Sequence, residues 1–163
     1  MNMLLNVLVN HACTQLSSKS FHQIFYFLRN PEPILGSAVC AGIEEFVRTL
    51  LHHFPNLIHY DVIPNQNILQ VAVEFLQEKI VNIIKKISPT TTKILCSVEL
   101  EFENNTLHLA GKLAPSFKLF SVSGAALQMQ RELQWFKDVE KMTSPSRKER
   151  KNTNNETAKD VFG

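Results

Sequence analysis

An internal repeat of 34 residues constrains the fold more than any other feature of this sequence. The segment that begins at Ile34 aligns with the segment that begins at Ile68, and apolar residues match along both copies. A third copy, residues 105–110, aligns with residues 67–72 at an offset of 38. The four extra residues (38 against 34) are expected in a loop within the polar stretch 88–93. The matched pairs of the first two copies are Ile34/Ile68, Leu35/Leu69, Ala38/Ala72, Val39/Val73, Glu44/Glu78, Phe46/Ile80, Val47/Val81 and Leu50/Ile84.

The length of this period favours ankyrin repeats, which run to about 33 residues and place a turn and two short helices around a T-P-L-H-x-A signature. The third copy keeps Thr-Leu-His-Leu-Ala at residues 106–110, and the first keeps Pro-Ile-Leu at residues 33–35. We therefore predict an all-α fold, an ankyrin-repeat solenoid of stacked helix-turn-helix units with hairpin loops, followed by a long C-terminal helix. The residues assigned to the structural ankyrin motif are Pro33, Leu35, Ala38, Gly42, Leu69, Ala72, Leu107, His108 and Ala110.

Polar residues beside the repeats are expected to shape the turns. His108 is predicted to tie neighbouring turns together by hydrogen bonds, and Gln70 in the second copy can also donate and accept. Asn65 and Asn104 stand where the repeat needs a residue with positive φ, a conformation that asparagine tolerates well.

The chain divides into four predicted segments. Residues 1–32 form N-terminal helices (1–16 and 21–29), a remnant repeat or linker, and residues 33–121 form the ankyrin repeats. Residues 122–143 form a long amphipathic helix, and residues 144–163 a polar tail that resembles the start of a further repeat. Residues 94–103 alternate between apolar and polar, which by period alone indicates a strand and in an ankyrin context an extended hairpin finger. Residues 144–155 are predicted to be solvated and mobile.

Composition limits the class of protein. A hydrophobic fraction of 44% with 20% charged residues is sufficient for a packed core. The net charge of +2 gives no support for a nucleic-acid or membrane partner. Cys13, Cys40 and Cys96 are widely spaced in apolar surroundings, which predicts reduced, buried thiols. No apolar run reaches the roughly 18 residues of a membrane span, and residues 1–9 lack a secretory pattern. A cytoplasmic chain is expected.

No catalytic, cofactor or metal site is predicted. His52, His53 and His59 with Cys40 match no zinc spacing, and adjacent helical residues diverge by about 100°. The basic run 147–151 fits either a nuclear-localisation or phosphate-binding patch or a solvated linker, and the linker is favoured. Two possible interaction residues, Trp135 and Phe136, are interpreted either as an exposed hot spot or as packing of the long helix on the last repeat.

Three segments together resemble plant ankyrin-repeat proteins of the PGG-domain class: residues 38–45, residues 67–80 and residues 107–115. Residues 122–140, VSGAALQMQRELQWFKDVE, are close to the hallmark of that family, and the resemblance covers residues 25–162. It implies an array that acts through protein contacts, followed by a membrane-spanning PGG domain that this sequence does not include. Full-length members of that family resemble membrane proteins of the plasma membrane or endomembranes.

From this resemblance we expect a protein–protein interaction module in plant defence or stress signalling, with other proteins as partners and no nucleic acid. Membrane contact would come only through the missing C-terminal domain or a partner. The alternative is a fragment of a multi-pass membrane ankyrin protein whose function needs the transmembrane domain.

Overall fold

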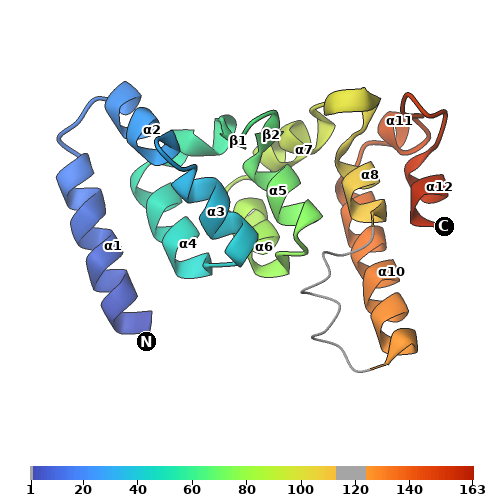
Figure 1. The fold of residues 1–163 in the computed structure, drawn as a ribbon, viewed down its shortest axis with the longest axis horizontal. Helices are drawn as coiled ribbons and strands as arrows, with labels where there is room; N and C mark the ends of the chain where they lie inside the picture. The colour runs from blue at the N-terminus through green and yellow to red at the C-terminus, as the bar shows by residue number, and fades with distance from the viewer. Residues whose placement is uncertain (1, 113–123) are drawn as a thin grey trace.

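The computed structural model describes residues 2–112 and 124–163, which are mostly α-helical (Figure 1). The all-α class predicted from the sequence is therefore confirmed. Residues 113–123, which include the end of the predicted repeat region and the start of the predicted long helix, lie outside the described part. The elements in chain order are α1 (Asn2–Leu16), α2 (Phe21–Arg29), α3 (Ile34–Ala41), α4 (Glu44–His53), η1 (Pro55–His59), β1 (Asp61–Ile63), β2 (Gln66–Asn67), α5 (Ile68–Glu74), α6 (Glu78–Ile87), α7 (Pro89–Ser97), η2 (Glu101–Glu103), α8 (Thr106–Gly111), α10 (Ala125–Met142), α11 (Pro145–Lys148) and α12 (Ala158–Phe162).

The 34-residue period of the sequence is also the period of the helices. The first helices α3 and α5 begin 34 residues apart, and so do the second helices α4 and α6. The connecting helices η1 and α7 begin at Pro55 and Pro89, again at this offset. Each unit thus consists of a first helix, a second helix and a short connecting helix that starts with proline, a residue well suited to the first helical turn.

Reciprocal capping boxes start three of the first helices. At α5, the Oδ1 atom of Asn67 accepts hydrogen bonds from the N–H groups of Leu69 and Gln70, and Gln70 Oε1 accepts from the N–H of Asn67. The same arrangement recurs at α8 with Asn105 and His108. It recurs again at α12 with Thr157 and Asp160. Each box satisfies backbone donors that the first helical turn would otherwise leave unpaired.

The turns only partly follow the prediction. Asn65 has φ 61°, as expected, but Asn104 has φ −66°. In that loop the left-handed residues are Phe102 (φ 60°) and Glu103 (φ 56°). The prediction for Asn104 is wrong because the 3-10 turn η2 reverses the chain one and two residues earlier and leaves Asn104 extended, immediately before the N-cap of α8.

The predicted loop at 88–93 and the predicted strand or finger at 94–103 are also corrected. Residues 89–97 form the helix α7 instead. Ser88 caps this helix by accepting the N–H of Thr91, and Pro89 occupies its first turn. Thr92, Leu95 and Cys96 are buried at helical spacing, so the apparent alternation runs from the end of a helix into an extended loop.

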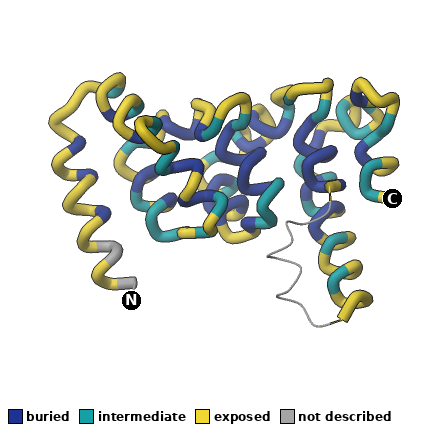
Figure 2. The backbone as a smooth tube through the Cα atoms, in the orientation of Figure 1, coloured by how far each residue is buried: buried dark blue, intermediate teal, exposed yellow. Residues whose placement is uncertain are grey.

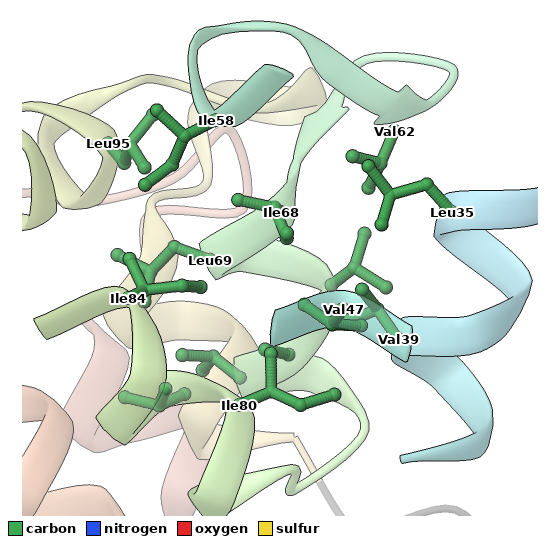
Figure 3. Packing of buried hydrophobic residues seen from close by; sticks show 14 of the residues in the cluster. Leu35, Val39, Val47, Ile58, Val62, Ile68, Leu69, Ile80, Ile84 and Leu95 are labelled. Carbon is green, nitrogen blue, oxygen red and sulfur yellow. The ribbon is translucent and has the colours of Figure 1, made fainter. Parts of the chain in front are cut away.

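The helices stack in two rows (Figure 1). The first helices α3, α5, α8 and α12 contact one another in this order, and α1, α4 and α6 form a second row behind them. Buried residues are concentrated along the middle of the array (Figure 2). Side chains from both rows interdigitate there, including Leu35, Val47, Ile68 and Ile80 (Figure 3). Each such side chain contributes roughly 1.5–3 kcal/mol when fully buried.

The C-terminal part is folded along its described length. The predicted helix at 122–143 is observed as α10, apart from residues 122–123, which are not described. The stretch 144–155, expected to be solvated and mobile, instead contains α11 and a tight turn with φ 62° at Asn155. Lys151 bridges to Thr157, and Asn152 is buried. Within residues 2–112 and 124–163, no helix has both the length and the apolar character needed to cross a membrane.

Candidate protein-interaction surface

Side chains of two capping boxes also bond to the short helix that precedes the next first helix. Asn67 donates from Nδ2 to the carbonyl oxygen of Leu95 at 3.0 Å. The equivalent Asn105 donates to the carbonyl oxygen of Arg147 at 2.9 Å. The cap residues therefore fix both the start of their own helix and the position of the short helix that leads to the next unit.

The third residue of each box makes a second bond of this kind. Gln70 donates from Nε2 to the carbonyl oxygen of Val98 at 3.0 Å. In the next unit, His108 is fully buried and accepts the N–H of Asn105 on Nδ1. The neutral ring then carries its proton on Nε2, which donates to the carbonyl oxygen of Glu156 at 3.2 Å. Both ring nitrogens are occupied, so His108 ties neighbouring turns and is not placed for catalysis.

The turn tips are joined by a further set of hydrogen bonds. Asn65 donates from Nδ2 to Oε1 of Glu101 at 2.8 Å. The N–H of Thr153 donates to the carbonyl oxygen of Phe102 at 3.0 Å, and Asn152 Nδ2 donates to Oδ1 of Asn104 at 3.2 Å. Three successive turns are thereby held in one row along the edge of the array.

Phe102 is the most exposed aromatic side chain of this row. Its side chain is 70% exposed although its backbone is left-handed, a conformation that costs an L-residue roughly 1–2 kcal/mol. A groove of about 280 Å³ lies beside it between neighbouring turn tips. The groove is lined by Pro64, Asn65, Gln66, Leu100, Glu101, Phe102, Asn104, Leu109 and Lys112.

The basic run that the sequence placed in a solvated linker is partly neutralised by one acidic side chain. Arg147 Nη1 lies 2.6 Å from Oε1 of Glu99, and the Arg150 guanidinium pairs with the same oxygen atom. These ion pairs join α11 to the loop after α7. The two arginines are therefore part of the fold, and they do not form a free phosphate-binding patch.

Trp135 and Phe136 do not form an exposed hot spot. Their exposed fractions are 8% and 4%. Trp135 donates from Nε1 to the carbonyl oxygen of Val73 at 3.3 Å, and the ring centroid of Phe136 lies 4.9 Å from that of Phe162. The interaction role is therefore corrected in favour of the packing interpretation, because both rings anchor α10 on neighbouring helices.

The residues of the predicted ankyrin motif lie along the first helices and at their ends. Gly42 ends α3 in the left-handed conformation with φ 71°, and Pro33 precedes the same helix. The others are buried: Leu35, Ala38, Leu69, Ala72, Leu107, His108 and Ala110.

The described residues offer little for metal or thiol chemistry. No group of three or more histidine, cysteine or acidic side chains among them is arranged to hold a metal ion. Burial raises the pKa of Cys13 and Cys96 above the usual thiol range, and burial together with the negative charge of Glu74 raises the pKa of Cys40. Thiols with raised pKa values are poor nucleophiles at neutral pH.

Sequence reasoning missed Phe102 and the inter-repeat role of Asn67 and Asn105. The signal for Phe102 was present, since it follows Leu100 on the apolar side of the alternating stretch. The stretch changes from helix to extended loop before Phe102, so the direction of its side chain could not be read from the alternation.

The comparisons with known proteins give no relative for this chain. Its sequence matches no protein-family model, no curated protein and no solved structure.

Proposed function

We propose that this chain is an ankyrin-type solenoid that works as a protein-interaction module. Three observations support the ankyrin type. The helix starts repeat every 34 residues, each first helix is followed by a second helix, and the side chains of Asn67 and Asn105 bond to carbonyl groups beyond their own helix. The resemblance of residues 25–162 to plant PGG-class proteins adds a proposed role in defence or stress signalling.

The exposed ring of Phe102 is the observation that carries the binding role. A large apolar side chain in water contributes nothing to folding, and the left-handed backbone of Phe102 is held by a hydrogen bond from the N–H of Thr153 in the next turn. Strained residues that the surrounding structure maintains are characteristic of binding sites. Aromatic anchors commonly dominate the affinity of protein interfaces. The partner surface is therefore the row of turn tips around Phe102 and its groove.

The test begins by identifying a partner with a photoreactive phenylalanine analogue at position 102, and then measures its affinity with purified components. Phe102→Ala is expected to weaken binding by at least about tenfold, because hot-spot side chains lose that much when truncated. Tyr26→Ala is the matched control, since Tyr26 is 64% exposed on α2, away from the turn row. Equal affinities for the wild type and Phe102→Ala would contradict the proposal.

A further inference from the structure

The sequence contains two Ser-Pro pairs, and each stands at the start of a short connecting helix. Ser88 precedes α7, and Pro89 is the first residue of that helix. Ser144 precedes α11, and Pro145 is the first residue there. The two helices hold equivalent places in the array, because the cap side chains of α5 and α8 donate to carbonyl oxygens within α7 and α11. One dipeptide thus occurs at two equivalent positions.

The two serine hydroxyl groups differ in what they bind. Ser88 is half-buried, and its Oγ atom accepts the N–H of Thr91 at 3.1 Å, which caps α7. Ser144 is exposed, and within the described residues of α11 its side chain caps no N–H group. Its Oγ atom lies 3.3 Å from Oγ of Ser146, which is also an exposed residue. The Ser144 hydroxyl is therefore open to a reagent in solution, whereas the Ser88 hydroxyl is held by the fold.

The hydroxyl groups on either side of Ser144 are less suited to react. Thr143 is 5% exposed, and its Oγ1 atom donates to the carbonyl oxygen of Val139 at 3.0 Å. Ser146 lies inside the helical turn of α11 and is followed by Arg147. Ser144 has φ −64° and ψ 150°, an extended backbone. Protein kinases bind the residues around an acceptor serine in this extended form.

The residues after Ser144 carry the two features that one class of kinase recognises. Proline-directed kinases place the residue after the serine where its N–H would find no acceptor, so they prefer proline, which has no N–H. Pro145 meets this requirement. Cyclin-dependent kinases also bind a basic side chain three residues after the serine, and Arg147 stands there at the start of the basic run 147–151. The equivalent residue of the other copy is Thr91, which is uncharged.

Arg147 can turn to a kinase without leaving its partner unpaired. Its Nη1 atom lies 2.6 Å from Oε1 of Glu99, and the Arg150 guanidinium pairs with the same oxygen atom. When Arg147 is drawn away, Glu99 keeps Arg150. Ion pairs that remain partly exposed, as these do, contribute little to stability. The shared carboxylate therefore makes Arg147 available for recognition at low cost.

We propose that Ser144 is phosphorylated by a proline-directed kinase of the cyclin-dependent type. The Oγ atom of Ser144 attacks the γ-phosphorus of Mg-ATP, and the hydroxyl proton passes to the catalytic aspartate of the kinase. The bond between the γ-phosphorus and the β,γ-bridging oxygen breaks, which releases ADP. The new phosphate carries about −1.5 to −2 charges near pH 7 and lies beside the basic run 147–151, so the product is electrostatically favoured. This inference does not rest on the proposed function.

The test incubates the full chain with a cyclin-dependent kinase, its cyclin and Mg-ATP, and locates the phosphate by tandem mass spectrometry. We expect phosphate at Ser144 and none at Ser88. Pro145→Ala should lower the rate of transfer by at least about tenfold, because alanine brings an N–H that the kinase leaves unpaired. Ser146→Ala is the matched control and should be phosphorylated as the wild type is. Circular dichroism would establish that all variants fold.

Three outcomes would overturn the inference. One is the absence of phosphate at Ser144 of the folded chain. Transfer to a synthetic peptide of residues 140–151 would then show that the fold shields the site, and no transfer to it would show that the sequence is not a substrate. Another is equal phosphorylation of Ser88 and Ser144, since the capped hydroxyl would then be as reactive as the open one. The last is phosphate on Ser146 that persists in Ser144→Ala.

Discussion

The Nε2 atom of His108 lies 3.2 Å from the carbonyl oxygen of Glu156, 48 residues further along the chain. In the preceding unit Gln70 makes the equivalent bond to the carbonyl oxygen of Val98. An imidazole and an amide thus perform one task at equivalent positions, because each offers an acceptor for its own cap and a donor for the next turn.

Replacing His108 tests this equivalence. His108→Gln should retain most of the stability, whereas His108→Leu removes two hydrogen bonds and leaves the buried N–H of Asn105 unpaired. We expect the leucine variant to lose about 1–3 kcal/mol, the cost of one orphaned buried group. Urea unfolding followed by the fluorescence of Trp135, the one tryptophan of the chain, measures the difference. Equal losses in the two variants would show that ring shape matters more than hydrogen bonding.

A second prediction concerns the left-handed end of α3. Gly42→Ala forces a left-handed conformation on an L-residue and brings its Cβ within 2.5 Å of Gln77 Oε1. We expect a loss of at least about 1–2 kcal/mol from the backbone alone, with a further loss from the contact. The same substitution in a Gln77→Ala background is the control, because the side chain that meets the new Cβ is then absent. If thermal unfolding shows equal losses in the two backgrounds, the contact with Gln77 is not a constraint.

A third prediction separates stability from binding at Phe102. Phe102→Asn should raise stability by about 0.5–1 kcal/mol, because asparagine accepts the left-handed conformation and the exposed ring contributes no burial. Binding at the turn row should fall in the same variant. Phe102→Val, with a β-branched side chain, should lower stability instead. The idea fails if both variants shift the urea midpoint in the same direction.

A fourth prediction follows from the cap of α12. Hydrogen bonds from the backbone N–H and the hydroxyl of Thr157 lower the pKa of Asp160 in the folded state. The unfolded chain then binds more protons between the folded pKa and the ordinary value of about 3.9, so stability rises with pH across this window and is lost as pH falls through it. Asp160→Asn should flatten that part of the pH profile, measured as the urea midpoint between about pH 2 and pH 5. A profile unchanged by the substitution would assign the acid sensitivity to other carboxyl groups.

The period of the fold and many helix boundaries were readable from the sequence. Residues 21–29 form the predicted helix, and the 34-residue offset recurs in the starts of α3, α5, α4 and α6. These signals are local or repeated, so they need no knowledge of distant contacts. The family resemblance and its signalling role stay predictions.

The errors arose where contacts between units decide the outcome. The sequence predicts a loop and a finger where α7 forms, because a short polar helix with Pro89 at its start resembles a turn in sequence. Burial of Trp135 depends on Val73, 62 residues away.

The hydrogen bonds that the cap side chains make beyond their own helix all run toward the C-terminus. Asn67 and Gln70 donate to residues that follow them, and so do Asn105 and His108. If the segment after α10 frays, Asn105 and His108 lose their acceptors, and disorder there weakens the unit before it. Fraying at α1 removes no acceptor from either cap. Local unfolding of this array should therefore spread from its C-terminal side toward its N-terminal side, because all four side chains depend on acceptors that follow them in the chain.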